Sequence, residues 1–444
     1  MATDPIRRVR ERAYETPLDL DARAALIRLA ALPPQSTTPY LTASLDWRPE
    51  GADPGREPAV DLRPSERRAN RETRGASRRP ARQEFDRVVA QLIAEHGPRG
   101  EAFDSLQADA ARIATYLDAE LDPSAQGVFV VANSAAGVFE PLALGLPVAT
   151  RIATGPVPAL LSLGLLVDDH PTYAVLTADQ HNAKLTFVTQ ATPDQSVSLD
   201  SNDWPRKQGT GGLAQRRLQA RAGERVSAFA RGIAEETQRA LEETGVAMLV
   251  VAASEVMASA LDAEFHPTVK ERTIAAIRRD PGLSDRDLLE QTLPLAQQAE
   301  RDSEAAAAAL LRAALVPEGL GMAGPVGTLR ALRNGDVKML LMNDDFRGVG
   351  WTDFSLSLYG TGEPPTEHPT GGDLAQIVPI AVEDELVRLA ALTGAEIQIV
   401  HTTVPIADDA TEIPRAGGPL PRTEAAIILD EMGGVGALLR FARR

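Results

Sequence analysis

The feature that most constrains the fold is the apolar run VAMLVVAA at residues 246–253, which has a helical pattern on each side. An apolar run of this length between two helices is typical of a strand that is buried inside an α/β sheet. The sequence therefore predicts a mixed α/β fold, because neither an all-helical nor an all-strand chain would place such a run between helices.

The same alternation of helical and strand patterns recurs along the chain. Amphipathic periodicity predicts helices at 18–32, 83–118, 218–241, 284–315, 324–335 and 382–394. Short apolar runs predict strands at 40–47, 127–133, 136–144, 336–344 and 395–401. A hairpin is expected at 172–190 with Asn182 and Ala183 in its turn, and 346–373, rich in Gly, Pro and Thr, is expected to be a long loop.

The length of 444 residues predicts about three domains of roughly 150 residues each. We expect an N-terminal α/β domain at 1–156, a middle domain at 157–317 and a C-terminal α/β sandwich at 318–444. Residues 48–82 contain five prolines and many arginines but few large apolar residues, which predicts a long mobile loop. Its basic second half either contacts phosphate or is simply solvated.

Composition excludes several classes of protein. The 43% of hydrophobic residues and 24% of charged residues are typical of a globular chain with a normal core. The absence of cysteine excludes disulfides, thiolate metal sites and cysteine nucleophiles. No apolar run reaches the length of a membrane span and the N-terminus lacks a secretory signal, so we expect a cytoplasmic protein without a membrane partner. The net charge of −16 indicates that any contact with nucleic acid is local.

Residues 206–231, RKQGTGGLAQRRLQARAGERVSAFAR, form a local exception to this acidity. Seven basic residues stand against one acid there, and Gly209, Gly211 and Gly212 lie within four positions. Glycines allow a backbone to approach another molecule closely, and a cationic segment on an acidic protein indicates contact with a polyanion. The alternative is a solvated loop before a surface helix. The glycines match neither common phosphate-binding pattern, so a nucleotide pocket is a poor explanation.

Conventional catalytic sites are not visible in the sequence. The six histidines show no metal-ligand spacing, and neither a GxSxG motif nor a Ser-His-Asp set can be assembled. The acid pairs Asp168–Asp169 and Asp344–Asp345 are the only hint of a magnesium site. Adjacent positions on a strand point to opposite faces, so such pairs seldom bind one ion together. We expect no cofactor and no metal, and we attribute the alanine run 305–309 to close packing in a helix.

Two groups of motifs carry a resemblance to a known family. The segment GTGGLAQRRLQAR at 209–221 is similar to a glycine-glycine-glutamine loop that is followed by an arginine-bearing helix. The later stretches TLRALRNGDVKMLLMND, ELVRLAALTGAEIQIV and GGVGALLRF at 328–344, 385–400 and 433–441 recur in the order of the same family. The chain thus resembles the bacterial relatives of the archaeal and eukaryotic class I peptide release factors and of Pelota, a group related to the hibernation factor Balon.

The resemblance implies an RNase H-like middle domain that carries the loop into the ribosomal peptidyl transferase centre. It also implies roles for individual residues. Gly211 and Gly212 would permit the backbone geometry, and Gln215 would help to place the attacking water. The RNA-binding positions it implies are Arg206, Lys207, Arg216, Arg217, Arg221 and Arg225. The spacing departs from the family, because Leu213 and Ala214 separate the second glycine from the glutamine.

Two functions follow from this resemblance. In the first, the protein hydrolyses the peptidyl-tRNA ester on stalled ribosomes without reading a codon, since the N-terminal domain shows no recognisable stop-codon motif. In the second, it occupies the tRNA site without chemistry and acts in rescue or hibernation, as the altered loop spacing suggests. The expected partners are ribosomal RNA, the tRNA site and a translational GTPase, with no DNA.

Overall fold

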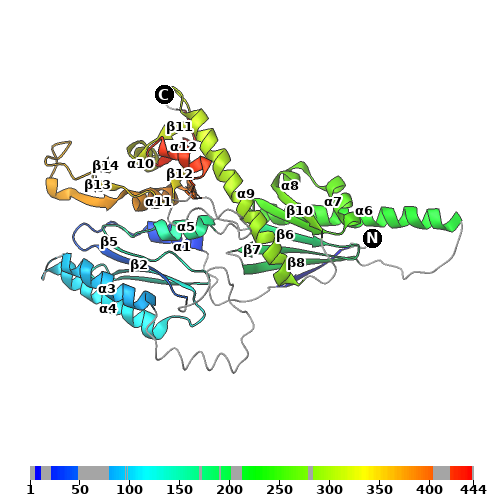
Figure 1. The fold of residues 1–444 in the computed structure, drawn as a ribbon, viewed down its shortest axis with the longest axis horizontal. Coiled ribbons are helices and arrows are strands. Elements are labelled where there is room, and N and C mark those ends of the chain that lie inside the picture. The colour runs from blue at the N-terminus through cyan, green and yellow to red at the C-terminus, as the bar shows by residue number, and fades with distance from the viewer. Residues whose placement is uncertain are drawn as a thin grey trace. The chain divides into compact units, whose positions relative to one another are not determined.

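The computed structural model describes residues 6–11, 22–48, 80–95, 97, 99–169, 173–189, 192–201, 213–278, 284–403 and 421–442. The described chain is divided into two compact units, shown in Figure 1. One unit joins Met1–Pro17 to Asp169–Ser303, and the other joins Leu18–Asp168 to Glu304–Arg444. Most of the expected first and third domains fall within one unit, and the three-domain division remains a prediction. No helix within the described ranges has both the length and the apolar character that crossing a bilayer requires.

The first unit is built on a six-stranded sheet of order β1-β8-β7-β6-β9-β10. These strands are β1 (Ile6–Glu11), β6 (Tyr173–Ala178), β7 (Asn182–Thr189), β8 (Thr192–Ser201), β9 (Met248–Ala253) and β10 (Thr273–Arg278). The buried strand expected at 246–253 is confirmed as β9, which runs parallel to β6 and β10. The edge strand β1 was not expected, and it joins the chain's N-terminal region to the sheet of the middle region.

The hairpin expected at 172–190 is confirmed as β6 and β7, but its turn lies earlier than expected. Asn182 and Ala183 are the first residues of β7, and Ala183 pairs with Ala178. The carboxylate of Asp179 accepts hydrogen bonds from the backbone N–H groups of His181 and Asn182, at 2.7 and 2.8 Å. An aspartate that binds the backbone two residues ahead closes a turn by itself, so the turn forms at 179–181.

Helices cover both faces of this sheet. Their bounds are α6 (Leu213–Thr244), α7 (Glu255–Glu264), α8 (Pro267–Arg272) and α9 (Asp285–Ala314). Alternate residues of β6, β7 and β9 face α6 and α7 in one apolar cluster, and the intervening residues face the first half of α9 in another. The period of two in each strand therefore supplies two cores, which makes this unit a three-layer α/β sandwich.

The second unit contains an antiparallel sheet of order β4-β3-β2-β5. Its strands are β2 (Tyr40–Asp46), β3 (Gly127–Asn133), β4 (Val138–Leu144) and β5 (Arg151–Gly155). The helices associated with this part of the chain are α1 (Ala22–Ala30), α3 (Pro80–Glu95), α4 (Glu101–Thr115), the π-helical turn η1 (Tyr116–Glu120) and α5 (Leu161–Asp169). The helical pattern expected at 83–118 is thus two helices. Of the loop expected at 48–82, residues 49–79 lie outside the described residues.

The C-terminal part of the second unit contains two further sheets. The first has the order β11-β17-β12-β16, with β11 (Gly321–Ala323), β12 (Val337–Asn343), β16 (Glu396–Val400) and β17 (Val435–Leu439). The second has the order β14-β13-β15, with β13 (Val349–Asp353), β14 (Leu358–Thr361) and β15 (Ile377–Ala381). The associated helices are α10 (Pro325–Arg333), η2 (Leu374–Gln376), α11 (Val382–Thr393) and α12 (Glu424–Asp430).

The prediction of a long loop at 346–373 is wrong, because β13 and β14 form a hairpin within this range. Both strands are short and each contains a glycine, which hides the strand pattern in the sequence. At Gly360 an added Cβ would lie 2.3 Å from the indole ring of Trp351, so the glycine is needed for the ring to lie on the strand. A glycine in a strand often marks such a close approach.

The second unit is held together by a single apolar cluster and by buried acids at the start of α11. Residues of α1, α5 and the β2–β5 sheet share this cluster with residues of α10, α11 and β12. Asp384 accepts two hydrogen bonds from the guanidinium of Arg151, at 2.7 and 2.8 Å, and a third from the backbone N–H of Leu161, at 2.9 Å. Residues 18–168 and 304–444 are therefore joined by a buried ion pair as well as by apolar contacts.

Candidate functional site

The segment at 206–231, which the sequence singled out, follows β8, and its residues from Leu213 on belong to α6. Residues 202–212, with Arg206, Lys207, Gly211 and Gly212, lie outside the described residues, so the roles expected for them stay predictions. Helix α6 begins at Leu213, which puts the backbone of Gln215 in its first turn. The first backbone N–H groups of any helix have no partner inside the helix, so they can donate to an acceptor from outside.

The second half of α6 is firmly attached to its own unit. The buried side chains there are Phe229, Ala230, Ile233, Ala234, Ala240 and Leu241. The guanidinium of Arg272 donates to the carbonyl oxygens of Leu241, at 2.9 Å, and Val246, at 3.1 Å. Carbonyls at the end of a helix lack helical partners, so this arginine satisfies one of them and fixes the C-terminal end of α6.

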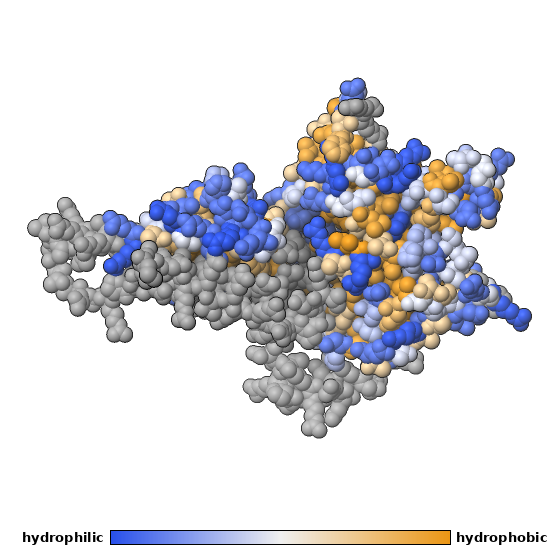
Figure 2. Space-filling model, turned by 180° about the vertical axis from the view of Figure 1, so that it is seen from behind, coloured by the Kyte–Doolittle hydropathy of each residue, from blue (hydrophilic) through white to orange (hydrophobic). Residues whose placement is uncertain are grey.

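In the stretch of α6 before Phe229, side chains are described from Glu224 on. Glu224, Arg225, Ser227 and Ala228 are exposed, whereas Val226 is partly buried against the apolar cluster of its unit. Figure 1 shows this part of the helix extending past the sheet of its unit. Seen from behind in Figure 2, the described surface of the same unit is mainly hydrophilic. At 1.5 Å per residue, residues 213–228 span roughly 24 Å, so the helix keeps its N-terminal end well away from its attached half.

The arginines of α6 differ in how they are used. The guanidinium of Arg231 lies 3.0 Å from the carboxylate of Glu264 on α7, and that hydrogen bond raises the pKa of Arg231. Arg225, two turns earlier, is exposed and has no hydrogen bond or ion pair with any described residue. Arg217, Arg221 and Arg225 recur every four residues, a spacing that places successive positions on one face of a helix.

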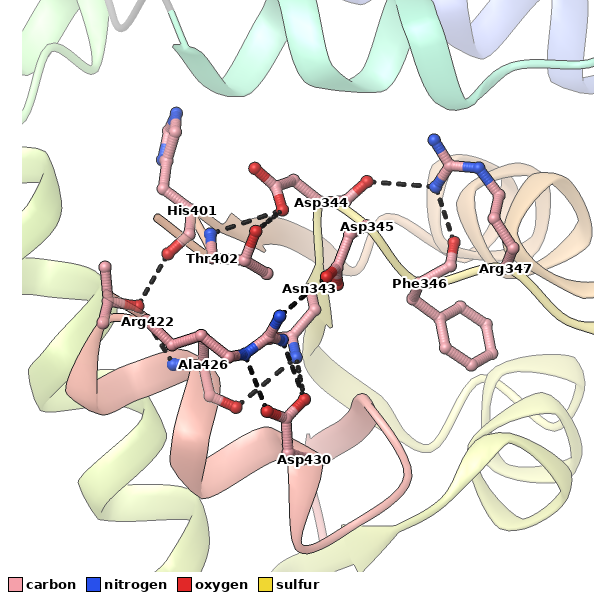
Figure 3. Close-up of polar contacts among 11 residues, drawn as sticks. Asn343, Asp344, Asp345, Phe346, Arg347, His401, Thr402, Arg422, Ala426 and Asp430 are labelled. Carbon is pink, nitrogen blue, oxygen red and sulfur yellow. Dashed lines mark hydrogen bonds and ion pairs between the residues drawn. The ribbon is translucent and has the colours of Figure 1, made fainter. Parts of the chain in front are cut away.

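The acid pair Asp344–Asp345 lies where β12 ends, beside the end of the parallel strand β16, and is drawn in Figure 3. The two side chains have different partners. Asp344 accepts hydrogen bonds from the hydroxyl and the backbone N–H of Thr402, at 2.6 and 3.3 Å. Asp345 forms an ion pair with Arg422 at 2.8 Å. The pair therefore does not converge on one position, as the sequence argument from adjacent residues anticipated.

Arg422 completes a small polar network at this edge. Its guanidinium extends between the carboxylates of Asp345 and Asp430 in Figure 3, and it lies 2.9 Å from Asp430. The buried side chain of Asn343 donates to Asp430 at 2.8 Å. These contacts tie Arg422, just before α12, and Asp430, the last residue of α12, to the end of β12, and they occupy the acids that could have bound a cation. No group of three potential metal ligands occurs among the described residues.

The other acid pair also has a structural role. Asp168 and Asp169 are the last residues of α5, and a carboxylate oxygen of Asp168 accepts a hydrogen bond from the backbone N–H of Ile399 at 2.8 Å. The contact links the end of α5 to β16 within the second unit. A magnesium site at either acid pair has no support in this geometry.

Two histidine–carboxylate pairs were not anticipated from the sequence. His401 Nδ1 lies 2.7 Å from the carboxylate of Glu304 on α9, and His368 Nε2 lies 3.1 Å from Asp353. Ser355 donates to Asp353 at 2.6 Å rather than to the histidine, so the second set lacks the serine–histidine contact of a catalytic triad. Both pairs connect residues far apart in sequence, and no sequence spacing could have revealed them.

One part of the chain is similar to a known protein family. Residues 158–314 match the model of bacterial archaeo-eukaryotic release factor family 10. This match covers β6 to β9, the 209–221 motif and all of α6, so the resemblance expected from the sequence is confirmed over that stretch. No curated protein shows significant similarity to the chain.

Several solved structures are similar to this chain at low identity. An archaeal translation termination factor, aRF1, is 13% identical, with 96% of this chain and 100% of that chain covered and a TM-score of 0.23. Dom34 of S. cerevisiae, described as interacting with Hbs1, is 11% identical, with 75% and 78% covered and a TM-score of 0.35. Ribosome-bound archaeal Pelota, in a model with ABCE1, is 13% identical, with 98% and 97% covered and a TM-score of 0.37.

Proposed function

We propose that this chain is a release-factor-like protein that binds the ribosome and brings the 206–225 segment to the peptidyl-tRNA. The family match over residues 158–314 is the observation that carries the proposal, because it contains the glycine motif and the helix that follows it. The exposed side chains of Glu224, Arg225, Ser227 and Ala228 on α6 support this proposal physically. A helix anchored only by its second half can carry a loop into a narrow RNA-lined space that the acidic body of the protein would avoid.

The reaction we propose is hydrolysis of the ester that joins the peptide to tRNA on a stalled ribosome. Such a step needs an ordered water as nucleophile and donors for the oxyanion that forms at the ester carbon. Gln215 would hold the water, and the lack of side chains at Gly211 and Gly212 would allow close approach. Ribosomal RNA would supply the rest of the site.

A second function has a specific observation in its favour. Gln215 belongs to the first turn of α6 and is separated from Gly212 by Leu213 and Ala214, so its backbone is not at the tip of a loop. A factor of this kind would fill the tRNA site without chemistry, as expected for ribosome rescue or hibernation. In either case the protein acts without reading a stop codon, and association with a translational GTPase stays a prediction.

Peptide release separates the two functions. Stalled ribosome complexes with a labelled peptidyl-tRNA are mixed with the wild type, Gln215→Ala or Gly212→Ala, and binding is checked by co-sedimentation. Hydrolysis predicts release by the wild type and a loss of about 10²-fold or more in the glutamine variant. Binding of all three proteins without release supports the second function. Failure of the wild type to sediment with ribosomes contradicts both.

A further inference from the structure

The three-stranded sheet β14-β13-β15 has two faces of different character. Its inner face packs on α11, where Gly350 lies so close to Val382 that an added Cβ would be 2.6 Å from that side chain. Tyr359 is also on this face and donates its hydroxyl hydrogen to the buried carboxylate of Glu385, at 2.9 Å. Both burial by the helix and the hydrogen bond to Glu385 raise the pKa of Tyr359. The inner face is therefore covered by α11.

The outer face is apolar and open at one end. Val349 is 60% exposed, and its neighbours along β13 alternate between this face and the buried one. Trp351 is partly exposed, and its cross-strand partner on β15 is the exposed Pro379. The Trp351 indole lies on the backbone of Gly360, so the ring rests on β14 with no side chain beneath it. Val349, Trp351 and Pro379 form what we call the tryptophan face.

The other end of the outer face is closed by the loop that connects β14 and β15. The side chain of His368, 2% exposed, contacts that of Asp353, 1% exposed. The remaining ring nitrogen of His368 accepts hydrogen bonds from the backbone N–H groups of Gly372, at 3.0 Å, and Thr370, at 3.3 Å. The loop is thus held at a fixed place by a buried pair.

The chain that forms the tryptophan face and its loop carries acids, whereas the exposed Arg347 lies just before β13. No lysine or arginine occurs between Arg347 and Arg388 in the sequence. The loop held by His368 exposes Glu363, Glu367 and Asp373. A negative surface is repelled by RNA phosphates and attracts cationic groups, and an exposed indole adds cation–π attraction for arginine or lysine. This surface has the opposite charge to the segment at 206–231.

We propose that the tryptophan face binds a basic, partly apolar segment of a partner protein. The apolar side chains would be covered by the partner's aliphatic or proline residues, and the acidic loop would pair with its cations. Such a surface lets the C-terminal region contact protein while the segment at 206–231 contacts RNA. Where the partner is a ribosomal protein, the inference rests on the proposed function. Binding to a free basic peptide does not depend on it.

A peptide experiment tests the face directly. The full-length chain is titrated at low ionic strength with a fluorescein-labelled peptide of four Arg-Pro-Leu repeats, and with a counterpart that has glutamate in place of arginine. We expect the arginine peptide alone to bind. Val349→Lys, and Glu363→Gln combined with Glu367→Gln, should each weaken its binding by about fivefold, since each change removes or opposes attraction at an exposed site.

Matched controls remove the effect of net charge. Glu255→Gln combined with Glu271→Gln removes the same two charges from exposed positions in the first unit, and Val256→Lys adds a cation at a valine on α7 that is 52% exposed. These variants should bind the arginine peptide as the wild type does. Equal weakening by both sets of variants would show general charge attraction only and would overturn the proposal.

Cross-linking identifies the class of partner. Benzoylphenylalanine is placed at Val349, with Val256 as the control position, and purified ribosomes are irradiated with each protein after sedimentation. Cross-links from position 349 to a lysine- or arginine-rich stretch of a ribosomal protein support the inference. Cross-links to RNA, or none from a complex that sediments, contradict it. If the protein does not sediment, the proposed function fails instead and the peptide result alone decides on the face.

Discussion

Helix α6 carries the exposed arginine Arg225, whereas helix α11 begins with three acids that are all buried. Each acid of α11 has its own partner. Glu383 accepts a hydrogen bond from the N–H of Gly348 at 3.0 Å, Asp384 binds Arg151, and Glu385 forms an ion pair with Arg388 at 2.7 Å. In α6, Arg225 has no partner among the described residues.

The difference shows that charge on a helix is informative only together with burial. Three acids at the start of a helix look like ordinary solvated residues that complement the helix dipole. In α11, Glu383 and Asp384 instead bind the distant Arg151, so their charge is already used in folding. On α6, Arg231 is paired with Glu264, whereas the charge of Arg225 is not paired with a described residue. The following variants test whether the acids of α11 and the arginines of α6 differ in their contribution to stability.

The largest effect is expected from Asp384→Ala. The change leaves Arg151, whose side chain is 23% exposed, without its main partner, and it removes the acceptor for the N–H of Leu161. Loss of one member of a mostly buried ion pair costs about 3–5 kcal/mol of unfolding free energy, which urea denaturation would measure. Replacing both residues, Asp384→Leu with Arg151→Met, should cost less than Asp384→Ala. A small effect of Asp384→Ala would show that the acids of α11 do not join these regions.

An intermediate effect with a defined pH dependence is expected from Asp353→Asn. Hydrogen bonds from Ser355, the N–H of Leu356 and His368 lower the pKa of Asp353 below its unfolded value. A lowered pKa contributes stability that is fully present above the unfolded pKa of about 3.9 and is lost as the pH falls through the folded value. Urea midpoints of the wild type and the variant should therefore differ most at neutral pH and converge below about pH 4. A constant difference would contradict this account.

The smallest effect on stability is expected from Arg217→Gln, Arg221→Gln and Arg225→Gln combined. Glutamine has nearly the helix propensity of arginine, and Arg225 has no contact with the described residues to lose. The urea midpoint should correspond to a change of at most about 0.5 kcal/mol. A large loss would mean that these arginines stabilise their own unit, in which case the contrast with α11 disappears.

Elements with a strong local pattern could be predicted from the sequence. The hairpin β6–β7, the buried strand β9 and the helix–strand pairs α10–β12 and α11–β16 each combine periodic apolar residues with a clear end signal. Gly394 ends α11 with a positive φ of 64°, as a glycine after a helix commonly does. Strands β13 and β14 were missed because Gly350 and Gly360 interrupt runs of only five and four residues.

Features that depend on distant partners could not be predicted. Glu383 and Asp384 are buried against Arg151, which lies more than 200 positions away in sequence, and Glu385 is buried with Tyr359 and Arg388. The pair of Asp353 and His368 depends on how a glycine-rich loop folds back. The alanine run 305–309 was attributed to packing, and that holds for Ala307 and Ala308, which are buried, but Ala306 and Ala309 are exposed. Only the fold distinguishes these positions.

Salt dependence of ribosome binding tests the central claim most directly, namely that the first part of α6 is a cationic arm for RNA. Co-sedimentation is measured between about 50 and 200 mM salt for the wild type, the three-arginine variant and Arg231→Gln, whose arginine is already paired with Glu264. Each lost phosphate contact should reduce the magnitude of the slope of log affinity against log salt by about 0.7–0.9. The slope of the three-arginine variant should therefore be smaller in magnitude than that of the wild type by roughly two. Arg231→Gln should keep the wild-type slope. Equal slopes for all three proteins would contradict the account.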